Sequence, residues 1–330
     1  MHEWMVKVLV TEFVDDNALG IIREVAEVIY APEISMNDYK KLAKDLTAVV
    51  LNTAIQMTPE VMDLSPDLKV ISRTGTGVDN VHVAGATERG ILVLHTPDAT
   101  TMSVAEHTVA LIGAISKHIL FLDGETRKGN FKTSRRLYLP VDLDGKILGV
   151  IGFGRIGREV ARKCMAAFNM KVMMYDSFFR ATMLPEGVMK CETEQQVFSE
   201  ADIITLHMPL TDATRNHVNE SLLSLMKPTA YLINTARGKI VDEHYLATML
   251  RENRLAGAAF DVLANEPPVL SDDLFNAPNM IITPHCAPLT PECLMRISGE
   301  AALGVADWIR GKTPKFIYNR ELLEGKNKLT

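Results

Sequence analysis

A glycine-rich run in the middle of the chain, Gly152-Phe153-Gly154-Arg155-Ile156-Gly157, restricts the folds open to it more than any other segment. It follows the apolar run Ile147–Ile151 directly and opens an amphipathic segment of helical length, Ile156–Ala167. A strand, a glycine turn and a helix in this order form a Rossmann phosphate-binding corner, where free N–H groups at the helix N-terminus face a pyrophosphate. The first glycine would permit the tight turn, the second the approach of the pyrophosphate, and the third close packing of helix on strand. The run therefore predicts a dinucleotide-binding domain.

The residue at the end of the next expected strand indicates which dinucleotide. Asp176 follows the apolar run Val172–Tyr175. A carboxylate there can accept hydrogen bonds from both ribose hydroxyls and would repel a 2′-phosphate, so NAD is favoured over NADP.

Strand-like runs alternate with helix-length segments along the whole chain, which is typical of α/β proteins. At 330 residues and 47% hydrophobic content, two domains are expected. The first alternation has expected strands at Val6–Val10, Ala48–Leu51, Val70–Ser72 and Ile91–Leu94, and expected helices such as Ala18–Val25 and Met36–Ala43. The second has six expected strands in a Rossmann sheet, at Ile147–Ile151, Val172–Tyr175, Ile203–Leu206, Ala230–Ile233, Ala258–Phe260 and Met280–Ile282. A long apolar helix from Ser103, a polar arm over Gly124–Leu143 and a final helix over Glu292–Ile309 complete the prediction.

Charge and composition argue against several classes of partner. The net charge of −6 gives no reason to expect a nucleic-acid partner, and no apolar run is long enough to predict a membrane span. The four cysteines are scattered without a CxxC pair, which indicates reduced thiols in a cytoplasmic protein and no metal site.

Three residues near the ends of late strands could catalyse oxidation of a 2-hydroxy acid. Such a reaction needs a cation for the carboxylate, a proton acceptor for the hydroxyl, and a group that sets the charge of that acceptor. Arg237, in Asn234-Thr235-Ala236-Arg237-Gly238, could grip the carboxylate and polarise the C2 oxygen. His285 could be the acid and base, and Glu266 could orient its ring and stabilise the imidazolium. Taken singly, each residue has a purely structural alternative as a surface cation, a turn residue or a packed histidine.

Together these segments resemble the D-isomer-specific 2-hydroxyacid dehydrogenase family. The resemblance rests on the glycine run, Leu206-His207-Met208-Pro209-Leu210-Thr211, the Arg237 segment, Phe260-Asp261-Val262, Asn265-Glu266-Pro267 and Pro284-His285. It implies that Arg237, Glu266 and His285 are catalytic and that Asp261 holds the nicotinamide carboxamide. The expected cofactor-binding residues are Gly152, Gly154, Arg155, Ile156, Gly157, Asp176, His207, Pro209, Thr235, Ala236 and Asp261.

The resemblance also implies how the domains are divided. A discontinuous flavodoxin-like substrate domain is expected over residues 1–100 and 288–330, and the Rossmann domain over residues 101–287. Backbone N–H groups of Thr76 and Gly77 would bind the substrate carboxylate together with Arg237 and His285. The Ser103 helix and the following arm, about residues 103–143, resemble the dimer-forming element of the family, so a homodimer is expected.

Two substrate classes remain open at this point. The segment Arg73–Val81 and the run Ser103-Val104-Ala105-Glu106-His107 resemble the phosphoglycerate dehydrogenase branch. The loop Leu51–Thr58, however, holds no cation, whereas a phosphate usually needs one. Only Arg73, or Arg135 and Arg136 from a partner subunit, would remain. A small unphosphorylated 2-oxo acid such as glyoxylate or hydroxypyruvate is therefore favoured, with 3-phosphoglycerate as the alternative.

The segment just after His285 departs from the family pattern. Cys286-Ala287-Pro288-Leu289 stands where an apolar residue and small residues are common, and Pro288 and Leu289 could reshape the pocket. A thiol mechanism through Cys286 is disfavoured because the histidine already accounts for the site. A non-enzymatic reading, an NAD-responsive interaction scaffold, is disfavoured by the retained Arg237, Glu266 and His285.

Overall fold

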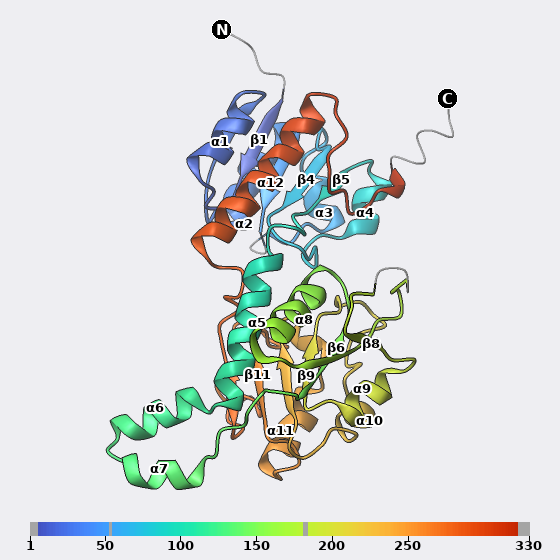
Figure 1. The fold of residues 1–330 in the computed structure, drawn as a ribbon. Helices are drawn as coiled ribbons and strands as arrows, with labels where there is room; N and C mark the ends of the chain where they lie inside the picture. Colours follow the sequence, from blue (N-terminus) through green and yellow to red (C-terminus); the bar gives the residue numbers. More distant parts are fainter. Residues whose placement is uncertain (1–5, 53–54, 181–183, 323–330) are drawn as a thin grey trace. The chain divides into compact units, whose positions relative to one another are not determined.

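The computed structural model describes residues 6–52, 55–180 and 184–322. The chain divides into two compact units, Met1–Thr100 with Leu289–Thr330, and Thr101–Pro288 (Figure 1). We call them the first and the second unit. Thr53 and Ala54, in the loop predicted to lack cations, and the ends of the predicted substrate domain lie outside the described residues.

The first unit is a five-stranded parallel sheet in the order β2-β1-β3-β4-β5. Its strands are β1 (Lys7–Val10), β2 (Glu27–Tyr30), β3 (Ala48–Leu51), β4 (Val70–Arg73) and β5 (Leu92–Leu94). Its helices are α1 (Asp16–Arg23), α2 (Met36–Leu42), α3 (Pro59–Met62), α4 (Val83–Glu88) and α12 (Pro291–Ile309), with a 3-10 turn at Ala43–Asp45.

Apolar residues cover both faces of this sheet, which explains why its strands read as continuous hydrophobic runs. Along β1, Leu9 packs in one core cluster, whereas Val8 and Val10 pack in another. The Leu9 cluster includes side chains of α2, α3 and α4, and the other cluster includes side chains of α1 and α12.

Helix α12 brings the C-terminal part of the chain onto the first sheet. It begins after Thr290, whose Oγ1 accepts the N–H of Cys293 at 3.1 Å, and it buries Ile297, Ala301 and Val305 at a spacing of one helical turn. Beyond it, the fully buried Asn319 accepts the N–H of Val93 through Oδ1 at 2.8 Å. The C-terminal segment thus completes the core and the β5 edge of the first unit.

The second unit is a seven-stranded parallel sheet in the order β12-β11-β10-β9-β6-β7-β8. Its strands are β6 (Ile147–Ile151), β7 (Lys171–Tyr175), β8 (Val188–Lys190), β9 (Ile203–Leu206), β10 (Tyr231–Asn234), β11 (Gly257–Phe260) and β12 (Met280–Ile282). Its helices are α5 (Thr101–Ser116), α6 (Ile119–Arg127), α7 (Phe131–Leu137), α8 (Arg155–Phe168), α9 (Glu194–Glu200), α10 (Glu220–Leu223) and α11 (Glu243–Arg251), with a 3-10 turn at Gly238–Ile240. Side chains of α5 and α8 pack on one face, and those of α9, α10 and α11 on the other.

Two strands correct the sequence-based prediction, which gave the Rossmann sheet six strands and left out both β2 and β8. Both lie at the edge of their sheet. No residue of β2 is fully buried, and β8 buries Val188 alone. The apolar runs of these edge strands are short, Val28–Tyr30 in β2 and Val188–Met189 in β8.

The segment predicted as a polar arm, Gly124–Leu143, contains the end of α6 and the whole of α7. No residue of α6 is buried, and apolar side chains are exposed on α6 and on the arm, among them Leu120 and Leu139 at 60% and 74%. Among the described residues, no single helix is long and apolar enough to cross a membrane. Helices α5 and α6 meet that criterion only as a pair, with a bend of 56° between them.

Candidate active site

The glycine turn lies between β6 and α8, at the point where the strand order reverses between β6 and β9. Gly152 has φ +87°, and a Cβ there would stand 2.7 Å from the carbonyl carbon of His207. A Cβ on Gly157 would stand 2.3 Å from the Gly152 oxygen. Gly154 caps α8 and has open space where its Cβ would be, as close approach of a ligand requires. The turn is therefore shaped by backbone contacts that a side chain would block.

Asp176 lies directly after β7 and braces this turn. Its Oδ2 accepts the N–H of Phe153 at 2.7 Å, and its Oδ1 accepts the N–H of Phe178 at 2.8 Å. Each carboxylate oxygen has a second lone pair, so both can still accept a hydroxyl.

The other expected cofactor residues follow β9 and β10. Burial lowers the pKa of His207 to about 3, so its ring is neutral, and its Nε2 lies 2.9 Å from Thr205 Oγ1. Pro209 is exposed beyond it. Thr235 is buried against Thr108, with 2.9 Å between their hydroxyl oxygens. The expected set is thus distributed over the carboxyl ends of neighbouring parallel strands.

Arg237 is held by the loop that follows β10. Asn234 braces this loop, accepting the N–H of Ala236 at 3.0 Å and donating through Nδ2 to the Arg237 oxygen at 3.0 Å. Arg237 Nη1 donates to the Ala236 oxygen at 2.7 Å. A Cβ on the next residue, Gly238, would stand 1.9 Å from the carbonyl carbon of Leu263, so this loop packs directly against the one that carries Glu266.

Glu266 and His285 form a hydrogen-bonded pair. His285 Nδ1 lies 2.7 Å from Glu266 Oε2, and Glu266 Oε1 accepts the N–H of Leu263 at 3.0 Å. Burial acts to raise the pKa of Glu266, but the hydrogen bonds from His285 and Leu263 and the charge of Arg237 together lower it. Glu266 is therefore a carboxylate at neutral pH, and its bond to Nδ1 leaves Nε2 of His285 for another partner.

Asp261 fixes the backbone of the His285 segment. His285 has φ +52°, and its N–H donates to the main-chain oxygen of Asp261 at 2.8 Å. The next two N–H groups, of Cys286 and Ala287, donate to Asp261 Oδ1 and Oδ2, each at 2.9 Å. Three successive amides, from His285 to Ala287, thus bind one aspartate, which holds His285 in its left-handed conformation.

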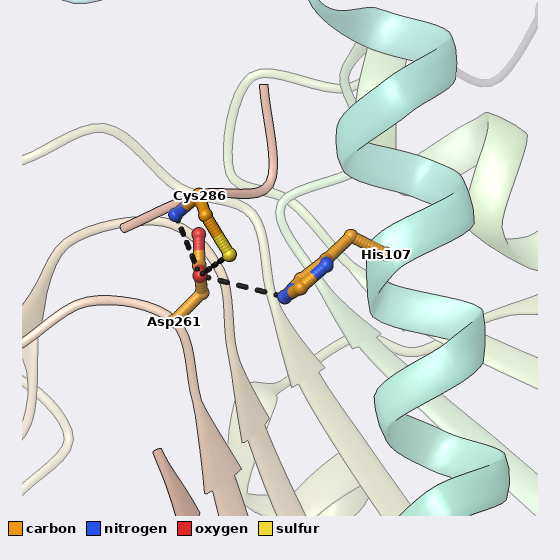
Figure 2. Close-up of side chains that lie close together, drawn as sticks. All are labelled: His107, Asp261 and Cys286. Atoms are coloured by element: carbon orange, nitrogen blue, oxygen red, sulfur yellow. Dashed lines mark hydrogen bonds and ion pairs between the residues drawn. The ribbon is translucent and has the colours of Figure 1, made fainter. Parts of the chain in front are cut away.

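Figure 2 shows Asp261 between Cys286 and His107, the latter on α5. The Asp261 side chain is 1% exposed. Although burial acts to raise its pKa, hydrogen bonds from His107, Thr283 and the backbone lower it to about 2. His107 was not among the expected site residues. In the sequence, the run Ser103–His107 indicates only a resemblance to one branch of the family.

Among the described residues, His107, Asp261 and Cys286 are the group whose ligand atoms lie close enough, within 4.8 Å, to suggest a metal ion. Hydrogen bonds account for this arrangement. Asp261 Oδ1 already accepts the hydroxyl of Thr283 at 2.5 Å and the N–H of Cys286, and the Cys286 Sγ lies 3.6 Å from it. Burial and the charge of Asp261 raise the pKa of the Cys286 thiol, which favours the protonated donor over a metal-binding thiolate.

Thr76 and Gly77 belong to the first unit, in the loop that follows β4. The Thr76 Oγ1 lies 2.7 Å from Thr100 Oγ1, and its main-chain oxygen lies 2.9 Å from His95 Nδ1. Gly75, with φ +137°, donates its N–H to Thr96 Oγ1 at 2.7 Å. The loop is thus anchored by its neighbours, and its role toward a substrate stays a prediction.

Comparison with known proteins decides the family. Residues 109–287 match the NAD binding domain of the D-isomer specific 2-hydroxyacid dehydrogenases. The chain is 33% identical over 326 residues to a glyoxylate reductase of Pyrococcus furiosus, covering 96% of each protein. This chain belongs to the D-isomer specific 2-hydroxyacid dehydrogenase family. Members of the family are nicotinamide-dependent oxidoreductases that act on CH–OH groups, and the predicted family, fold class and enzyme class are confirmed.

Relatives with other names resemble the chain equally well. It is 35% identical over 316 residues to a D-3-phosphoglycerate dehydrogenase of Methanocaldococcus jannaschii, covering 96% of this chain but 60% of that protein. The crystal structure of the TT0316 protein from Thermus thermophilus superposes with a TM-score of 0.86 at 33% identity, covering 95% of this chain and 100% of that one. Both substrate classes considered from the sequence therefore occur among its relatives.

Proposed function

We propose that this enzyme transfers a hydride between NAD and C2 of a small, unphosphorylated 2-hydroxy or 2-oxo acid, such as glyoxylate or hydroxypyruvate. The observation that carries the proposal is the 2.7 Å pair of Glu266 and His285, with the charge of Arg237 acting on the same carboxylate. These groups match the needs of 2-oxo acid reduction: a cation, a proton donor and a carboxylate that keeps the donor charged.

Each of these residues has a distinct task. Arg237 binds the substrate carboxylate and polarises the C2 oxygen. His285, held through Nδ1 by Glu266, presents Nε2 to that oxygen and gives it a proton during reduction, or takes a proton from the hydroxyl during oxidation. The nicotinamide supplies or accepts the hydride when it is bound. Asp261 keeps the His285 backbone in place while this proton moves.

The preference for NAD over NADP is part of the proposal and rests on Asp176. Its oxygens accept the N–H groups of Phe153 and Phe178, so the carboxylate stands beside the glycine turn that would hold the pyrophosphate. A 2′-phosphate in the position of the ribose hydroxyls would be repelled by this charge.

We propose that residues 1–100 and 288–330 bind the substrate through Thr76 and Gly77, and that residues 101–287 bind the cofactor. The enzyme is proposed to be a cytoplasmic homodimer that pairs through the segment 103–143. Exposed apolar side chains on this segment support the dimer, and the four cysteines, all described and none in a disulfide, support a reducing compartment. Sedimentation should give twice the chain mass, and Leu120→Glu should shift it to the monomer.

The test of substrate and cofactor is NADH oxidation with glyoxylate, hydroxypyruvate, pyruvate, branched 2-oxo acids and phosphohydroxypyruvate, repeated with NADPH. The expected result is highest kcat/KM for an unphosphorylated acid with NADH. Highest kcat/KM for phosphohydroxypyruvate would show that the enzyme is a phosphoglycerate dehydrogenase, and Arg73, Arg135 and Arg136 would then be the cations to replace. Loss of turnover in His285→Ala with unchanged NADH affinity separates an enzyme from a cofactor-binding scaffold.

A further inference from the structure

Three polar side chains lie at the carboxyl ends of adjacent strands in the first unit. Glu12 follows β1, Asn52 follows β3 directly, and Arg73 ends β4. In the order β2-β1-β3-β4-β5 the direction in which strands are added reverses between β1 and β3. Open α/β sheets bind ligands outside the carboxyl ends of the strands at such a reversal. Glu12 and Asn52 stand on its two sides.

These two residues are joined across the reversal. The N–H of Asn52 donates to Glu12 Oε1 at 3.0 Å, and Asn52 Nδ2 donates to Oε2. Asn80, which is nearly fully buried, donates through Nδ2 to the Asn52 oxygen at 2.5 Å. The carboxyl group and the amide that meets it are therefore fixed in position.

The backbone around them is fixed as well, because the sheet's hydrogen bonds continue past the strand ends. Thr11 donates its N–H and its hydroxyl to the Val50 oxygen, at 3.0 and 3.2 Å. Thr74 donates its N–H to the Leu51 oxygen at 2.8 Å. Such support of polar side chains on a rigid sheet edge is typical of binding sites.

Burial and three neighbouring residues, Asn52, Arg73 and Glu33, shift the pKa of Glu12. Burial raises its pKa to about 7, against the lowering effects of the Asn52 hydrogen bonds and the Arg73 charge, and the charge of Glu33 raises it further. Arg73 is thus the cation with the largest effect on the pKa of Glu12, Glu33 is a neighbouring anion, and Asn52 is a neutral donor. A half-buried carboxyl group that titrates near neutrality costs folding free energy, and such groups are frequent at functional sites.

We propose that Glu12 and Asn52 form a recognition site for a hydroxyl or ammonium group on the side chain of the 2-oxo acid. The inference rests on the proposed function, because it assumes that Thr76 and Gly77, after β4, hold the substrate carboxylate. From β4, the neighbouring strands β3 and β1 are about 5 and 10 Å away. A short substrate and the Glu12 side chain together span that distance. A carboxylate at this position accepts a hydrogen bond from a donor and repels a phosphate or a second carboxylate.

The experiment compares hydroxypyruvate, pyruvate and oxaloacetate as substrates for the full-length wild type and for Glu12→Gln. The wild type should prefer hydroxypyruvate to pyruvate. In Glu12→Gln this ratio of kcat/KM should fall at least about tenfold, while pyruvate is reduced as before and oxaloacetate improves. Glu27→Gln is the matched control, since it removes an exposed carboxylate at the amino end of β2, whereas Glu12 lies beyond the carboxyl end of β1, and it should leave all ratios unchanged. The 2-oxo analogue of arginine, with its cationic side chain, distinguishes an ammonium-like ligand from a hydroxyl.

A second measurement needs no variant. As Glu12 ionises between pH 6 and 8, the wild-type ratio of kcat/KM for oxaloacetate to kcat/KM for pyruvate should fall, because the second carboxylate of oxaloacetate stays charged and is repelled by Glu12. Dividing by the value for pyruvate removes the pH effects that the two substrates share. A flat ratio, or a hydroxypyruvate preference that survives Glu12→Gln within twofold, overturns the inference alone. If the wild type reduces no 2-oxo acid at any pH, the proposed function fails and the inference fails with it.

Discussion

Replacing Glu266 with glutamine tests the central pair of the site. The variant keeps the size of the side chain and an oxygen that can accept from His285 Nδ1, but it removes the charge that stabilises the imidazolium. Two unit charges about 4 Å apart are worth ~4 kcal/mol at an effective dielectric constant of 20. Both side chains are 39% exposed, so solvent screening reduces this to about 2 kcal/mol. That free energy corresponds to a loss of about 30-fold in kcat/KM for reduction.

The assay is NADH oxidation with the best 2-oxo acid between pH 5.5 and 9. The pKa of Glu266 is lowered, so the carboxylate is charged throughout this range. In Glu266→Gln, kcat/KM for reduction should be lower than in the wild type across the range, while NADH affinity stays unchanged. Glu220→Gln, which removes an exposed carboxylate from the first turn of α10, is the control. A Glu266→Gln variant with wild-type kcat/KM across this range would refute the reasoning.

Three further variants probe the cofactor turn and the His285 segment. Asp176→Asn keeps an acceptor for the Phe153 N–H but removes the charge, so the NADH to NADPH ratio of kcat/KM should fall by about tenfold, or 1.4 kcal/mol; an unchanged ratio contradicts the assignment. Gly152→Ala places a side chain at φ +87° against His207, so strain of about 1–3 kcal/mol should lower the melting temperature by several degrees and weaken NADH binding, as a thermal scan with and without NADH would detect. Asp261→Asn should cost about 2–3 kcal/mol of unfolding free energy at pH 7, because the lowered Asp261 pKa contributes stability above the unfolded value near 3.9 that is lost as pH falls toward about 2. Urea unfolding of both proteins between pH 7 and 3 should show the difference shrinking with acid, and a constant difference would argue against a charged Asp261.

The central strands, and the strand-end positions of the residues proposed to be catalytic, could be predicted from the sequence because both carry strong local signals. The runs Ile147–Ile151 and Ile203–Leu206, in which Thr205 is the one polar residue, form strands with the predicted limits. Arg237, Glu266 and His285 follow β10, β11 and β12, which are adjacent parallel strands, so their strand-end positions in the sequence already implied a common edge.

Other features could not be predicted because they depend on tertiary packing. His107 has an ordinary position in an apolar helix, and only the packing of α5 on the sheet brings it within 3.4 Å of Asp261. Glu12 is a single acidic residue after a strand, a common surface pattern. Its burial and its bonds to Asn52 come from the pairing of β1 with β3, which lie far apart in the sequence.

The division of the first unit into two stretches of sequence has a consequence for how the chain matures. The β5 amide of Val93 and the apolar face beneath α12 obtain their partners only from residues beyond 289. Residues 101–288 hold all seven strands of the second sheet and are synthesised before those partners. During synthesis on the ribosome, the β5 edge of the first sheet therefore lacks its Asn319 partner, and the apolar face that α12 will cover stays exposed to solvent, until the second unit has been made. This delay leaves an apolar face of the first unit open to aggregation and to chaperone binding until those residues are made.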